Sequence, residues 1–156
     1  IQTSEYTQHR FPSVSVETWD IHEFTYLSPA GLIGTTMAER RPLTQAYWEK
    51  CDPQFAHGPD AESFADFMRR TERLYLNLKD TPHDFVAVFC HGYVMKALFW
   101  SHLLGTFEAS PAHMRGFYLF HRSLDLFNCA ILEMQASQNK IWMGRLATDH
   151  LKKITV

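Results

Sequence analysis

The residue pair His91-Gly92 is the feature of this sequence that points most directly to chemistry. It follows five apolar residues, 85–89, and it precedes a segment whose apolar residues recur at helical spacing. An imidazole can exchange protons near neutral pH, and Gly92 interrupts the apolar run directly after it. Because the free N–H groups at the beginning of a helix attract anions, we expect an anionic substrate beside His91. A purely structural role for this histidine is the alternative.

The residues before His91 have the pattern of a strand in the centre of a sheet. Residues 85–89 show no alternation of polar and apolar side chains, which is typical of a strand covered on both faces, as in a parallel sheet. Ligands of open α/β sheets bind beyond the carboxyl ends of the strands, which is where His91 would lie. The sequence therefore predicts a three-layer α/β/α fold with a mainly parallel central sheet.

The rest of the chain alternates between helical and strand patterns. Helices are expected at residues 2–9, 43–50, 63–79, 93–104 and 111–120, and strands at 14–16, 129–134 and 141–146. Residues 136–139 have the composition of a hairpin turn. Residues 28–60 are rich in Pro and Gly, so we expect them to form an excursion or lid-like insertion within one domain that spans residues 1–156.

Composition narrows the classes of partner. The 15 Lys and Arg residues nearly balance 17 Asp and Glu residues, and no basic run occurs, so neither nucleic acid nor an anionic membrane is an expected partner. No apolar run approaches the roughly 18 residues that would cross a bilayer. Three cysteines without CxxC spacing favour a reduced, cytoplasmic location. The nine histidines form neither an HExxH motif nor a Cys/His cluster, so we expect no metal and no cofactor.

Four short motifs occur in an order that is similar to a known family. They are Glu62-Ser63 with Phe67 and Arg70, residues 86–92, residues 128–132, and Asp149-His150-Leu151. Their order and spacing resemble the carboxyl-terminal two-thirds of the histidine phosphatase superfamily, the phosphoglycerate-mutase-like proteins. The resemblance implies this family's α/β fold and a small phosphorylated substrate. A homodimer is compatible with it.

The resemblance also implies roles for three residues. His91 would hydrogen-bond the transferring phosphoryl group, and the backbone at Gly92 would contribute an N–H at the beginning of the following helix. Glu23 lies where the family carries its acidic proton donor, and a carboxyl group partly enclosed by Trp19 and Phe24 suits that task. Without the resemblance, Glu23 would be read as a solvated loop carboxylate.

One defining motif of the family does not occur in this sequence. The Arg-His-Gly that holds the phosphorylated histidine is missing, and the only other His-Gly pair, His57-Gly58, has no strand before it. Residues 1–3 are similar to the continuation of a family element whose arginine would precede Ile1. We therefore expect the chain to be N-terminally incomplete, with the nucleophilic histidine upstream, and to be inactive alone.

The predicted function is phosphomonoester hydrolysis through a phosphohistidine intermediate. A phosphatase is favoured over a phosphoglycerate-type mutase because the residues after Glu23, 24–29, are largely apolar. Tyr26, Tyr47 and Trp48 could line a lid or simply pack against the body. A non-catalytic, phosphatase-like binding domain is the second alternative. An α/β-hydrolase is disfavoured because the chain has no Gly-x-Ser-x-Gly.

Other polar residues are weaker candidates for the site. His150 and Asn128 are expected to have structural roles, and His22 is expected at the surface, although it adjoins Glu23. Arg40 or Arg41 could reach a phosphate or carboxylate of the substrate. Since neighbouring residues on a helix point in different directions, at most one of the two would do so.

Overall fold

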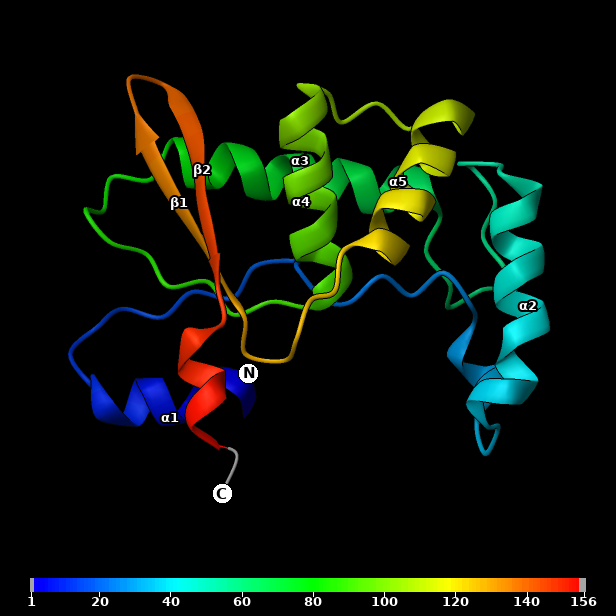
Figure 1. Ribbon diagram of the computed structural model, residues 1–156, viewed down its shortest axis with the longest axis horizontal. Helices are drawn as coiled ribbons and strands as arrows, with labels where there is room; N and C mark the ends of the chain where they lie inside the picture. The colour runs from blue at the N-terminus through cyan, green and yellow to red at the C-terminus, as the bar shows by residue number, and fades with distance from the viewer. Residues whose placement is uncertain (1, 155–156) are drawn as a thin grey trace.

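A computed structural model describes the backbone of residues 2–154 and the side chains of residues 3–151. Within these residues it has five α-helices, two strands and two short 3₁₀-helices (Figure 1). The elements are α1 (Gln2–Arg10), η1 (Pro29–Leu32), α2 (Met37–Lys50), α3 (Phe64–Lys79), α4 (Gly92–Leu104), α5 (Pro111–Ser123), β1 (Ile131–Ser137), β2 (Lys140–Ala147) and η2 (Asp149–Ile154). No helix among these is both long and apolar enough to cross a membrane.

Helices α3, α4 and α5 form the centre of the molecule around an aromatic core. Ser63 caps α3 by accepting a hydrogen bond from the Asp66 N–H at 3.1 Å, and Ser110 caps α5 in the same way. The segment before η1 adds Phe24, whose ring stacks on Phe67 with the centroids 4.3 Å apart. The buried core includes Phe24, Phe64, Phe67, Met68, Val94, Leu98, Met114 and Phe117.

Helix α2 lies at one side of the molecule and begins six residues earlier than predicted (Figure 1). Thr36 and Glu39 form a capping box, which satisfies N–H groups at the helix beginning. The predicted helix began at residue 43, directly after Pro42, yet Pro42 lies inside the helix. Tyr47 and Trp48 are buried in the core and are not part of a lid wall.

The predicted central strand does not pair with another strand in the part of the chain that the structure describes. Residues 85–90 run outside any helix or strand, and Phe85 is 85% exposed, whereas Val88 and Cys90 pack against the core. Backbone N–H and C=O groups need a neighbouring strand to form a sheet, and no described segment supplies one. The mixed α/β class holds, but the parallel three-layer sheet is not formed here. Residues 14–16, also predicted as a strand, are exposed and irregular.

The described sheet is the antiparallel hairpin of β1 and β2, which confirms the two predicted carboxyl-terminal strands. Ser137 pairs with Lys140, so Gln138 and Asn139 form a two-residue turn. Both turn residues have positive φ, 50° and 60°, as a type I′ turn requires. Met134 and Met143 attach the hairpin to the helical core.

A buried ion pair joins Glu62, just before α3, to Arg70 within this helix, and a backbone hydrogen bond joins Glu62 to the segment that carries Glu23. The guanidinium of Arg70 donates to both carboxylate oxygens of Glu62, at 2.6 and 2.9 Å. The backbone N–H of Glu62 donates to the carbonyl oxygen of Thr25 at 2.8 Å. The motif residues Glu62 and Arg70 therefore have a structural role. The contact of Glu62 with the chain at Thr25 lies two residues after Glu23.

Candidate active site

The carboxylate of Glu23 lies at the beginning of α4. Its Oε1 accepts hydrogen bonds from the backbone N–H of Tyr93 at 3.0 Å and of Phe24 at 3.1 Å. The beginning of a helix carries unpaired N–H groups and a partial positive charge, so an anion is stabilised there. The sequence predicted an anion at the beginning of the helix that follows His91. In the structure the carboxylate of Glu23, 70 residues before Tyr93, occupies this position.

His91 and Gly92 lie at the same helix end. His91 is the N-cap of α4 with an extended backbone, its side chain is exposed, and it makes no capping hydrogen bond. Gly92 is the first helical residue, and a Cβ added to it would lie 3.9 Å from Oε2 of Glu23. The structure therefore brings together the three residues that the sequence singled out, around one set of backbone N–H groups.

Two ionisable groups near this helix end, Cys90 and His121, are uncharged at neutral pH. Burial raises the pKa of the Cys90 thiol to about 11, with a smaller effect of the Glu23 carboxylate, so this thiol is protonated and is a poor nucleophile. Burial, helped by the cations Lys96 and Arg122, lowers the pKa of His121 to about 4, so its imidazole is neutral. Lys96 donates to the carbonyl oxygen of His121 at 2.8 Å.

Tyr93 is a site residue that the sequence reasoning missed. Its backbone binds Glu23, and its ring stacks on His121 with the centroids 4.3 Å apart. Burial raises the pKa of the Tyr93 hydroxyl, so this group stays protonated at working pH. Only the position directly after His91-Gly92 could have indicated that Tyr93 contributes to the site.

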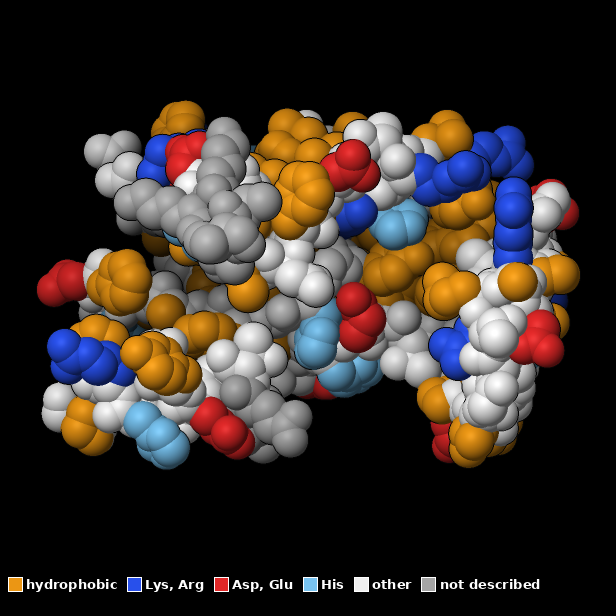
Figure 2. Space-filling model, turned by 60° about the horizontal axis from the view of Figure 1, so that its bottom comes forward, with side chains coloured by type: hydrophobic (Ala, Val, Ile, Leu, Met, Phe, Trp, Pro, Cys, Tyr) orange, Lys and Arg blue, Asp and Glu red, His pale blue; other side chains and the backbone are white. Residues whose placement is uncertain are grey.

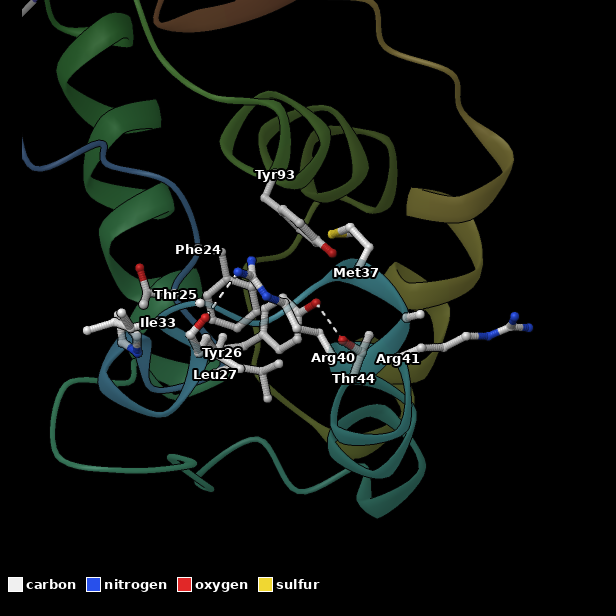
Figure 3. Close-up of a pocket in the computed structure, with 14 residues that line it drawn as sticks. Phe24, Thr25, Tyr26, Leu27, Ile33, Met37, Arg40, Arg41, Thr44 and Tyr93 are labelled. Atoms are coloured by element: carbon white, nitrogen blue, oxygen red, sulfur yellow. Dashed lines mark hydrogen bonds between the residues drawn. The ribbon is translucent and has the colours of Figure 1, made fainter.

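A pocket of about 970 Å³ opens beside this helix end. Figure 2 shows it as a hollow with a largely hydrophobic floor between α2 and the adjoining part of the molecule. Its lining comes from the segment after Glu23, from η1, from the first half of α2 and from Tyr93 (Figure 3). The main side chains are Phe24, Tyr26, Leu32, Ile33, Met37 and Tyr93.

The two arginines of α2 behave differently. The guanidinium of Arg40 donates to the carbonyl oxygens of Leu32 and Thr35 and to the Thr35 hydroxyl, at 2.8 to 3.1 Å. It therefore holds the turn between η1 and α2. Arg41 extends away from the other pocket residues (Figure 3). Among the contacts that the structure describes, neither arginine binds Glu23.

The other candidates have local contacts. Nδ1 of His57 accepts the N–H of Ser28 at 3.4 Å, and a Cβ at Gly58 would lie 2.8 Å from that of Ser28, so His57-Gly58 shapes a close loop contact. His150 lies 2.8 Å from the carbonyl oxygen of Cys129. His22 is exposed and contacts the Glu23 carbonyl oxygen through Nδ1, which must carry the proton because a carbonyl only accepts.

Comparison with known proteins identifies the family. A model of the histidine phosphatase superfamily (branch 1) matches residues 1–141. Neither a curated protein nor a solved structure matches the chain significantly. The members of this superfamily are phosphatases and mutases that act on small phosphorylated substrates. With a helix end that gathers His91, Gly92 and Glu23, and with a family match over nine-tenths of its length, the chain belongs to the histidine phosphatase superfamily.

Proposed function

We propose that the protein hydrolyses phosphomonoesters through a phosphohistidine intermediate, with the nucleophilic histidine outside these 156 residues. The observation that carries the proposal is the hydrogen bond between Glu23 and the Tyr93 N–H. Because of it, a carboxyl group lies at the same helix end as the exposed His91 and the helix N–H groups. The sequence contains no Arg-His-Gly. Residues 85–90 lie outside any helix or strand and residues 85, 87 and 89 are exposed, so a neighbouring parallel strand could pair there and would end beside His91.

Each group has one task in the first step. The nucleophilic imidazole attacks phosphorus in line with the ester oxygen, and a P–N bond forms as the P–O bond breaks. His91 and the N–H of Gly92 donate to the phosphoryl oxygens, whose charge must be stabilised in the transition state. Glu23 gives its proton to the departing oxygen, so the alcohol leaves neutral. In the second step water attacks phosphorus and the P–N bond breaks, which releases phosphate and the free imidazole, while the Glu23 carboxylate takes a proton from the attacking water.

The apolar pocket favours a phosphatase over a phosphoglycerate-type mutase. A mutase has to hold a second acidic group of its substrate, which calls for cations that face the site. Arg40 is bonded to Leu32 and Thr35, and Arg41 extends away from the pocket (Figure 3). A non-catalytic phosphate-binding domain is the other alternative. Phosphatase activity of the complete protein would exclude this alternative, and its absence would favour it.

The complete natural protein, with whatever residues precede Ile1, should hydrolyse phenyl phosphate in the presence of a chelator. The isolated 156 residues should show no turnover, because His91 stabilises charge and cannot replace the nucleophile. Phosphate release by both proteins is the measurement. Turnover by the 156 residues would place the nucleophile within them, and an inactive complete protein would favour the binding domain.

His91→Ala in the complete protein should lower kcat/KM for every phosphomonoester by about 2.7–4 kcal/mol, the effect of losing one transition-state donor. The loss should not depend on the leaving group, because the phosphoryl group is common to all substrates. His57→Ala is the matched control, since His57 also precedes a glycine but contacts Ser28. Equal losses for the two variants would contradict a catalytic role of His91.

A further inference from the structure

We propose that the pocket between η1, α2 and Tyr93 binds the apolar group of the substrate, so that the preferred substrates are phosphomonoesters of aryl or other bulky, uncharged alcohols. The inference rests on the proposed function, because it takes the beginning of α4 as the phosphoryl site. It adds the class of leaving group, which the family match does not give.

The pocket begins where the phosphoryl site ends. Phe24 and Tyr93 each bind Glu23 with the backbone N–H, and both residues line the pocket (Figure 3). A phosphoryl group held by His91 and the N–H of Gly92 would lie next to these two residues, so the group attached to its ester oxygen can reach the pocket. Glu23, as the proton donor, lies at the same boundary, as protonation of the ester oxygen requires.

The lining of the pocket suits an apolar occupant. Its volume of about 970 Å³ is at the upper end of the range for small-molecule sites. Two of its large apolar side chains are almost fully exposed, Ile33 at 85% and Met37 at 79%. Their exposure is unfavourable in water, and a ligand that covers them recovers this free energy. Met37, with its adaptable thioether, and Tyr93 both line the pocket.

Polar groups in the pocket are mostly bonded to each other. The hydroxyls of Tyr26 and Thr44 are 3.3 Å apart, and Arg40 is bonded to Leu32 and Thr35. The bonds of Arg40 use its Nε and Nη2 groups and go to uncharged oxygens, so this guanidinium stays a cation at the edge of an otherwise largely apolar lining. The apolar lining favours aromatic rings, which can pack on Tyr26 and Tyr93.

The test compares biphenyl-4-yl phosphate with phenyl phosphate on the complete protein. The two phenols are of similar acidity, so the chemical step differs little, whereas the second ring should raise kcat/KM about 10-fold by burial in the pocket. The product 4-phenylphenol should inhibit about 10-fold more tightly than phenol. 3-Phosphoglycerate should be a poorer substrate than phenyl phosphate.

Charge introduced into the lining should remove the preference. Met37→Glu and Ile33→Glu should each reduce the ratio of kcat/KM for the two aryl phosphates towards one. Ala46→Glu is the control, because Ala46 is an exposed residue of α2 outside the pocket, and it should leave the ratio unchanged.

The outcomes separate this inference from the proposed function. Equal kcat/KM for the two aryl phosphates, or an unchanged ratio in both pocket variants, overturns the apolar pocket but leaves the phosphatase intact. If neither ester is hydrolysed, the proposed function fails. Calorimetric binding of 4-phenylphenol then tests the pocket alone: no tighter binding than phenol, or equal binding by Met37→Glu, overturns it.

Discussion

Glu23→Gln should slow the hydrolysis of alkyl phosphates by about 10²–10⁴-fold, the usual contribution of a general acid, while substrates with acidic phenols should be affected far less. An alkoxide is a poor leaving group and needs the proton, whereas a nitrophenolate departs without it. The measurement is kcat/KM of the complete protein across esters whose leaving groups have graded pKa values. The slope of this plot should become steeper in the variant.

Glutamine is the informative substitution because it separates the proton from the hydrogen bonds. Its side-chain oxygen can still accept the N–H groups of Tyr93 and Phe24, so the beginning of α4 keeps its contact. Glu17→Gln is the matched control, since Glu17 lies in the same segment and its carboxylate accepts from the indole N–H of the partly buried Trp19, at 3.0 Å. An equal loss on all esters would mean that Glu23 positions the substrate and does not supply the proton.

The helices could be predicted where local signals agree. Ser63, followed by an apolar stripe at helical spacing, predicts α3, and the structure confirms it. At α2 two local signals conflict, since Pro42 argues for a boundary and the capping box of Thr36 and Glu39 argues for an earlier beginning. The capping box prevails, because it satisfies N–H groups of the first turn, whereas Pro42 removes only one hydrogen bond further on.

Strands could be predicted only where the partner is near in sequence. The hairpin of β1 and β2 contains its own pairing, and the two-residue turn fixes its register. Residues 85–89 have the apolar run of a buried strand, but a strand forms only beside another strand, and the pattern says nothing about where that neighbour lies. In the structure these residues therefore lie outside any helix or strand.

Individual residues of the site could be predicted from the sequence, but the pocket beside them could not. His91-Gly92 has a local pattern, since a break between an apolar run and a helix indicates free N–H groups. Nothing in the residues around Glu23 identifies it, and only the family resemblance pointed to it. The pocket could not be predicted, because η1, α2 and Tyr93 meet only in three dimensions and the sequence between them does not fix their distances.

Glu62→Ala should lower the free energy of unfolding by about 3–5 kcal/mol, because it leaves the guanidinium of Arg70 buried without its counter-ion. Arg70 is 3% exposed and Glu62 is 13% exposed, and both contacts of the guanidinium go to this one carboxylate. Urea unfolding of the complete protein and its variant, with equal m-values, measures the loss. The backbone bond from residue 62 to Thr25 remains, so the loss reports the ion pair itself.

Two further variants show whether burial is the cause. Glu133→Ala removes the partner of Arg145 at the same type of contact, 3.0 Å, but these side chains are 51% and 67% exposed, so the loss should be much smaller than for Glu62→Ala. The double variant Glu62→Leu/Arg70→Met should be much less destabilised than Glu62→Ala, because apolar side chains replace both charges. If Glu62→Ala were as mild as Glu133→Ala, water would have to reach Arg70, and the pair could not be what holds residue 62 against α3.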